Sequence, residues 1–140
     1  MERALDAELL QIYPTLPIEI LQLRTVDGVT PLGILALADD AVVGCGALQH
    51  VRTGVLEVRR MFVRPDCRRR GIARALVRAL VARARAQGAT TVRLVTGDRQ
   101  PAAVALYLEA GFSQVPGFDG APPGPHALCF ETHVTVAAWH

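Results

Sequence analysis

The feature that most constrains this chain is an arginine- and glycine-rich segment between an apolar run and a long helical pattern. The run Val58–Val63 leads into consecutive arginines, and Gly71 then opens the helical pattern. A strand that leads through such a turn into a helix forms an anion site, because the first N–H groups of a helix lack internal partners and the dipole there is positive. Gly71 and Ala73 are small enough for a ligand to approach the backbone. Residues Val63–Arg74 therefore predict a cradle for a pyrophosphate.

The charge distribution favours a small anionic ligand over a nucleic acid. The net charge is only +2, all 15 basic residues are arginine, and ten of them lie between Arg59 and Arg85. Glu57 and Asp66 are the acidic residues in and around this segment. A basic segment in a nearly neutral chain fits a compact polyanion, and no aromatic platform interleaves the arginines to stack bases. We therefore expect no nucleic-acid partner.

Length and composition indicate a single globular domain over residues 1–140, with 51% hydrophobic and 20% charged residues. Cys45, Cys67 and Cys129 show no CxxC spacing, which argues against a disulfide framework or a zinc site and for a reducing cytosol. The amino terminus has no apolar signal core, and no run approaches the roughly 20 residues that span a bilayer. We expect a cytoplasmic protein with no metal and no membrane partner.

The order of the expected elements is that of an α/β domain. Apolar runs predict a hairpin over Leu32–Leu37 and Val42–His50 and a third strand over Leu56–Val63. Apolar residues at i+4 spacing predict a helix over Gly71–Gln87, and the strand Thr90–Thr96 that follows it implies parallel pairing with a right-handed crossover. The other expected elements are short helices over Ala4–Ile12 and Ile18–Leu23, a helix over Pro101–Ala110, strands over Phe112–Val115 and Ala127–Val136, and a loop over Pro116–Pro125.

Two motifs on these elements resemble the GNAT superfamily of acyl-CoA-dependent N-acyltransferases. Residues Arg68–Ala73 match the family's Q/R-x-x-G-x-G/A motif, and Ala103–Phe112 match its A-x-x-L-Y-x-x-x-G-F segment, with Gln100 where asparagine is usual. The resemblance covers about residues Val42–Val134 and looks like a bacterial branch of small GNAT enzymes. It implies the GNAT fold, a central mixed and mostly antiparallel sheet with a splayed parallel strand pair, flanked by helices.

The resemblance also implies acetyl-CoA as the co-substrate. Backbone N–H groups at the start of the helix would hold the pyrophosphate, and the flanking arginines would supply positive surroundings. The main chain of Met61–Val63 would pair with the pantetheine amides like an added strand, because the splayed pair leaves these groups free. The implied cofactor-binding residues are Met61, Phe62, Val63, Arg68, Arg69, Arg70, Gly71, Ile72, Ala73, Arg74, Gln100 and Tyr107.

Tyr107 is the catalytic candidate that the resemblance indicates most directly. It occupies the position of the family's general acid, where a phenol supplies a proton or a hydrogen bond to the departing thiolate. The alternative is a core aromatic residue packed at helical spacing beside Leu106. The expected mechanism is direct transfer, with the thioester carbonyl polarised by a strand N–H and no covalent enzyme intermediate.

Glu57 is the candidate general base. A period of two along the strand predicts that Glu57, Arg59, Met61 and Val63 share one face, from which the carboxylate would take a proton from an ammonium acceptor directly or through water. The equally supported alternative is a salt bridge with Arg59 or Arg60. The less favoured bases are His50, His126 and His133, and Cys129 is interpreted as a buried structural thiol.

The amino terminus departs from the family pattern. Family members begin with a strand before the first helix, whereas here a helix is expected almost from Met1. Because a missing edge strand exposes the N–H and C=O groups of its neighbour, we expect a second subunit in a homodimer or a rearranged terminus to cover that edge.

The function implied by the resemblance is N-acetylation of a primary amine, on a small molecule or an amino-terminal group. The alternative is a binding module that holds acyl-CoA as a sensor or pseudo-enzyme, without turnover.

Overall fold

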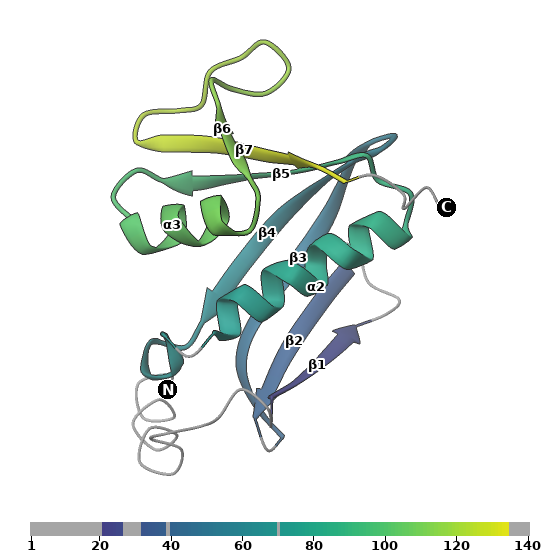
Figure 1. The fold of residues 1–140 in the computed structure, drawn as a ribbon, viewed down its shortest axis with the longest axis vertical. Helices are drawn as coiled ribbons and strands as arrows, with labels where there is room; N and C mark the ends of the chain where they lie inside the picture. The colour runs from purple at the N-terminus through teal and green to yellow at the C-terminus, as the bar shows by residue number, and fades with distance from the viewer. Residues whose placement is uncertain (1–20, 27–31, 39, 70, 135–140) are drawn as a thin grey trace.

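The computed structural model describes residues 21–26, 32–38, 40–69 and 71–134, which form a seven-stranded sheet with helices packed against it (Figure 1). The strand order is β1-β2-β3-β4-β5-β7-β6. The elements are β1 (Leu21–Val26), β2 (Leu32–Ala38), β3 (Ala41–Arg52), β4 (Val55–Val63), the 3₁₀ turn η2 (Pro65–Cys67), α2 (Ile72–Ala86), β5 (Thr91–Gly97), α3 (Pro101–Glu109), β6 (Ser113–Val115) and β7 (Ala127–His133).

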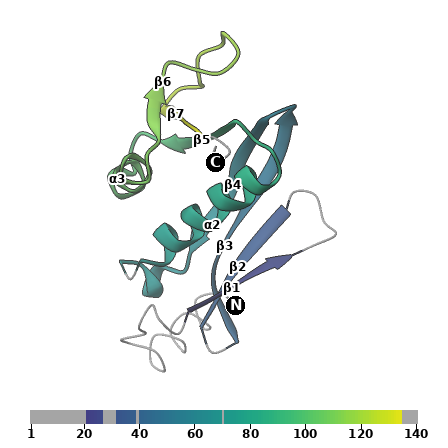
Figure 2. The same cartoon turned by 45° about the vertical axis from the view of Figure 1, so that its right-hand side comes forward.

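The parallel pair β4–β5 is where the sheet divides. On one side of this pair, antiparallel ladders join β1, β2, β3 and β4. On the other side, antiparallel ladders join β5, β7 and β6. β4 and β5 pair only over Val55–Glu57, although β4 continues to Val63 and β5 to Gly97. Figures 1 and 2 show the two strands diverging beyond this point. The expected mixed sheet with a splayed parallel pair is confirmed.

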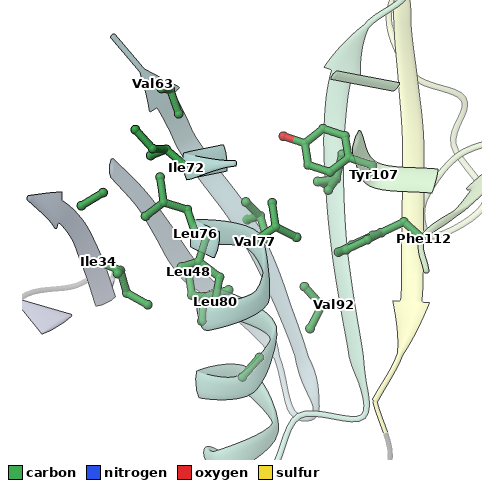
Figure 3. Close-up of a cluster of buried hydrophobic side chains, with 14 of the residues drawn as sticks. Ile34, Leu48, Val63, Ile72, Leu76, Val77, Leu80, Val92, Tyr107 and Phe112 are labelled. Atoms are coloured by element: carbon green, nitrogen blue, oxygen red, sulfur yellow. The ribbon is translucent and has the colours of Figure 1, made fainter. Parts of the chain in front are cut away.

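Helix α2 packs on one face of the first four strands and forms the centre of the core. Its residues Leu76, Leu80 and Ala84 recur at i+4 and are each 0% exposed. The close-up in Figure 3 shows Leu76 and Leu80 against strand residues such as Ile34 and Leu48. The close approach depends on Gly46, where a Cβ atom would lie 2.7 Å from Leu80 Cδ1. The expected helix over Gly71–Gln87 is thus confirmed to within one residue at each end.

Residues at the start of the described chain correct one expectation. The helix expected over Ile18–Leu23 is wrong for Leu21–Leu23, which belong to β1 and pair with β2 from Leu21↔Ala38 to Val26↔Gly33. Apolar and polar residues alternate along Leu21–Arg24, and pairing with the edge of β2 outweighs the local helical pattern. Residues 18–20 and the helix expected over Ala4–Ile12 lie outside the described residues.

The outer edge of β2, which was expected to be covered by a second subunit or by a rearranged terminus, is covered by β1 from the same chain. A strand before the first expected helix would fall within residues 1–20, outside the described part of the chain. The strand that covers this edge therefore comes after the expected helix in the sequence, whereas the family pattern places a strand before that helix. The argument for a second subunit at the edge of β2 does not apply.

A bulge in β4 overturns the expectation that Glu57, Arg59, Met61 and Val63 share one face. The register passes from Cys45↔Phe62 to Ala47↔Arg59, so β4 has one residue more than β3 here, and Arg60 has φ 58°. The extra residue reverses the alternation.

Met61 consequently points toward α2, with its Sδ 2.8 Å from the position of a Cβ on Gly46, and Val63 is buried in the same core. Leu56 and Val58 face this core too, which places Glu57 on the opposite face of the sheet.

The packing of α2 predicts a specific stability change. Leu80→Ala removes a fully buried side chain and is expected to lower the free energy of unfolding by about 2–5 kcal/mol. Leu108→Ala is the matched control, because this leucine is 53% exposed, and its expected effect is within about 0.5 kcal/mol. Chemical denaturation measures both. Equal losses in the two variants would contradict the assignment of α2 as the core helix.

Candidate active site

A groove of about 1280 Å³ opens where β4 and β5 diverge, bounded by the turn after β4, the start of α2, the end of β5 and helix α3. Every cofactor-binding residue expected from the sequence lines it except Arg70, which lies outside the described residues. The lining residues on that list are Met61, Phe62, Val63, Arg68, Arg69, Gly71, Ile72, Ala73, Arg74, Gln100 and Tyr107. The structure therefore brings the two sequence motifs to one site.

The start of α2 lies at one end of the groove and has the features of an anion site. Gly71 is the N-cap in the left-handed conformation, with φ 81°, which favours glycine. A glycine N-cap has no side chain to bond the N–H groups of the first turn, and the first helical bond at this end runs from Ala75 N–H to Gly71 O at 3.0 Å. The N–H groups of Ile72–Arg74 precede that bond and are available to an anion.

The arginines around the cradle are held in different ways. Arg68 donates from Nε to the carbonyl of Val63 at 3.0 Å, and its guanidinium lies 5.8 Å from the centre of the Phe62 ring. Arg74 forms an exposed ion pair with Glu109 at 2.6 Å, which joins the start of α2 to the end of α3. Arg68 is thus fixed to the end of β4, whereas Arg74 is shared with a carboxylate.

Below the same turn, Arg64 and Asp66 form an ion pair at 3.0 Å with each side chain 7% exposed. The backbone N–H of Arg64 also donates to the carbonyl of Val43 at 2.9 Å. Sequence reasoning grouped these residues with the general basic segment. The pair lies within the turn that leads from β4 to α2, and the Arg64 backbone bond ties that turn to β3.

Tyr107 contacts both the core and the groove. It is 7% exposed, its ring packs edge-on against Phe112 at 5.9 Å and beside Phe130 at 6.3 Å, and it lines the groove. In Figure 3 its hydroxyl points toward the side of Val63 and Ile72. Burial raises the pKa of Tyr107 above its ordinary value, so the phenol keeps its proton at neutral pH. The two sequence interpretations of this residue are therefore compatible.

Glu57 is not among the residues that line the groove; it lies at the last pair of the β4–β5 ladder, where the strands begin to diverge. Its Oε2 accepts from Arg59 Nε at 2.9 Å and its Oε1 from Arg93 Nε at 2.9 Å. The expected salt bridge with Arg59 is confirmed, whereas Arg60 is not the partner. The sequence patterns did not identify Arg93 as a partner of Glu57, although the two residues carry opposite charges and pair in the short parallel ladder.

The loop after β6 is fastened to the same cluster. The Arg93 guanidinium lies 4.4 Å from the centre of the Phe118 ring and donates to Asp119 at 3.2 Å. Asp119 also pairs with Arg52 at 2.8 Å. The hydrogen bond from Arg93 lowers the pKa of Asp119, which favours its charged form. Phe118 and Ala121 exchange backbone bonds of 3.1 and 3.0 Å, which closes the tip of the loop.

The other residues considered from the sequence do not line the groove. His126 and His133 are exposed and lie 3.3 Å from Asp98 and 3.4 Å from Glu131, and His50 is also exposed. Cys129 is 2% exposed, which confirms a buried thiol.

Among the described residues, no cluster of histidine, cysteine, aspartate and glutamate is suited to hold a metal ion. No helix in the described part of the chain has the length and apolarity to cross a membrane.

A splayed parallel pair, a glycine-capped helix start and a buried tyrosine in one groove define an acyltransferase of the GNAT type. The model of the Acetyltransferase (GNAT) family matches residues 3–112. The chain belongs to this family, and its enzymatic class is acyltransferase.

Named relatives and solved structures agree with this membership. The chain is 35% identical over 128 residues to an IAA acetyltransferase of Azospirillum brasilense, covering 91% of this chain and 84% of that protein. A candidate acyl-CoA N-acyltransferase from Klebsiella pneumoniae superposes with a TM-score of 0.69 at 28% identity, covering 96% of this chain and 87% of that one. A GNAT acetyltransferase from Elizabethkingia anophelis, solved with acetyl-CoA bound, shares the fold with a TM-score of 0.70 at 12% identity, covering 83% and 99%.

The burial of Tyr107 predicts a late ionisation. The chain has two tyrosines, Tyr13 and Tyr107, so a titration of tyrosinate absorbance resolves few phases. Because burial raises the pKa of Tyr107, its phase is expected above the ordinary value of about 10 and is expected to vanish in Tyr107→Phe. A phase removed by that substitution with a midpoint at or below the ordinary value would contradict the buried placement.

Proposed function

We propose that the protein transfers the acetyl group of acetyl-CoA directly to a primary amine, on a small molecule or an amino-terminal group. The observation that carries this proposal is the presence of Tyr107 in the same groove as the glycine-capped start of α2. The start of α2 can bind the pyrophosphate of the donor, and Tyr107 can donate a proton to the leaving sulfur. The names of the Azospirillum brasilense and Elizabethkingia anophelis proteins, both acetyltransferases, support the same class of reaction.

The residues of the groove fit acetyl-CoA as the donor. The start of α2 offers backbone N–H groups to the pyrophosphate, and Gly71 leaves them accessible. Along β4, the main-chain groups beyond Glu57 that face β5 have no strand partner among the described residues, so Met61–Val63 can bond the pantetheine amides. When bound, acetyl-CoA supplies an activated thioester to the amine.

Tyr107 is proposed as the general acid. Burial keeps its phenol protonated, and the hydroxyl faces the groove, so it can donate to a thiolate as the carbon–sulfur bond breaks. A main-chain N–H of β4 is proposed to bond the carbonyl oxygen as negative charge develops on it. The remaining proton leaves the attacking amine.

Glu57 is proposed to receive that proton through water. Its carboxylate is 8% exposed and bonds two guanidinium groups, but each oxygen retains a lone pair for a further donor. It lies at the closed end of the splay, toward which the thioester would point if the pyrophosphate sits at the start of α2. The alternative function is a module that binds acyl-CoA without turnover. It requires the anion site at the start of α2, but it does not require proton transfer by Tyr107 or Glu57.

Release of coenzyme A with a panel of amines, followed by thiol detection, tests the proposed function. Tyr107→Phe is expected to lower turnover by about 10²–10⁴-fold and to leave the affinity for acetyl-CoA within about twofold, because the hydroxyl acts only on the leaving group. Tight binding of acetyl-CoA with no thiol release for any amine would instead support the binding module. Unchanged turnover in Tyr107→Phe would remove this residue from the mechanism.

Glu57→Gln separates the proposed base from a purely structural ion pair. Loss of a general base is expected to lower turnover by about 10²–10⁴-fold at neutral pH, with residual activity that rises with pH as the free amine deprotonates unaided. The matched control is Glu131→Gln, a strand glutamate paired only with exposed His133 among the described residues. Turnover retained in Glu57→Gln together with a lower melting temperature would assign this residue to stability alone.

A further inference from the structure

Arg60 is the arginine of β4 that lines the groove, and no carboxylate of the described chain pairs with it. Arg68 and Arg69 also line the groove without a carboxylate partner among the described residues, but they lie in the turn before α2. The neighbouring guanidinium groups are engaged: Arg59 and Arg93 by Glu57, Arg64 by Asp66, and Arg74 by Glu109. Arg60 is exposed, lines the groove and forms no ion pair with any described residue. A guanidinium at a groove wall without an internal anion is available to an external one.

The bulge in β4 fixes where Arg60 stands. Its backbone has φ 58°, a conformation that non-glycine residues rarely adopt, and its carbonyl accepts from the thiol of Cys45 at 3.5 Å. Cys45 lies between Gly44 and Gly46, whose missing side chains face α2, so the thiol is on the helix-free face of the sheet. Burial raises the pKa of Cys45, and the nearby positive charge of Arg60 opposes that rise.

Arg60 also lies at the reacting end of the groove. It stands between the point where β4 and β5 diverge, at Glu57, and the main-chain groups of Met61–Val63. The anion-binding start of α2 is at the opposite end, beyond Val63. Under the proposed function, the pyrophosphate lies at α2 and the thioester lies near Arg60. The acceptor must therefore approach past this side chain.

We propose that Arg60 binds a carboxylate on the acceptor, so that the preferred substrate is an amine that also carries a carboxylate, as an amino acid does. This inference rests on the proposed acetyl transfer. The guanidinium presents a planar fork that matches a carboxylate with two parallel N–H···O bonds, and one positive charge balances one carboxylate. This contact would make the enzyme specific, because an acceptor without a carboxylate leaves the Arg60 guanidinium without that hydrogen-bonding partner.

The test compares matched acceptors. Amino acids and their carboxamides share the side chain and the α-amine, and the amine of the carboxamide is the less basic, which favours it intrinsically at neutral pH. Wild-type enzyme is nevertheless expected to show a kcat/KM for the carboxylate form at least about tenfold above that for the carboxamide, as expected for a charge-assisted hydrogen bond. Preference for the carboxamides, with turnover intact, would overturn the inference and leave the proposed function standing.

The variant Arg60→Gln locates the effect. It is expected to lower kcat/KM for carboxylate acceptors about tenfold or more, and to leave carboxamide acceptors and the KM for acetyl-CoA within about twofold. Arg85→Gln, an exposed arginine in the last turn of α2, is the matched control and is expected to change neither. Equal losses for both acceptor forms would overturn the inference. Absence of turnover with every amine would overturn the proposed function, and this inference with it.

Discussion

The divergence of β4 and β5 after Glu57 is the constraint on which the rest of the site depends. Two parallel strands that separate each leave a row of backbone groups without partners, and such groups are stable only if water or a ligand bonds them. The last residues that pair before the strands diverge are Glu57 and Arg93, and their side chains form an ion pair that links β4 to β5. Arg93 in turn holds the loop that carries Phe118. The point of divergence and the loop after β6 are thus joined by a single charged cluster.

The distribution of arginines becomes understandable once their partners are known. Most of those near the groove have structural duties, since they bond carboxylates or carbonyls on another element. The positive potential at the start of α2 therefore comes from backbone N–H groups as much as from side chains. Under the proposed function, the small residues Gly71 and Ala73 would keep these N–H groups accessible to the ligand. Arg60, in contrast, forms no ion pair with any described residue, so its guanidinium is available to a ligand.

Local patterns predicted the elements from Leu32 to Val115 well, because helical and strand periods are written in neighbouring residues. Gly71, Tyr107 and Gln100 were found through short motifs whose spacing places them on known parts of one fold. What failed depends on pairing between distant strands. The strand at Leu21–Val26 forms against β2, and the bulge at Arg60 is a matter of register with β3. Neither is encoded in the period of one segment.

The ion pair between Arg74 and Glu109 makes α3 an internal competitor for the cradle. A bound anion that recruits Arg74 must share it with, or take it from, the carboxylate at the end of the helix that carries Tyr107. Under the proposed function, this competition would lower the affinity for the pyrophosphate, and added salt would weaken both the internal pair and the contact with the ligand. Binding at the start of α2 would then act, through the Arg74 side chain, on the helix that carries the proposed acid.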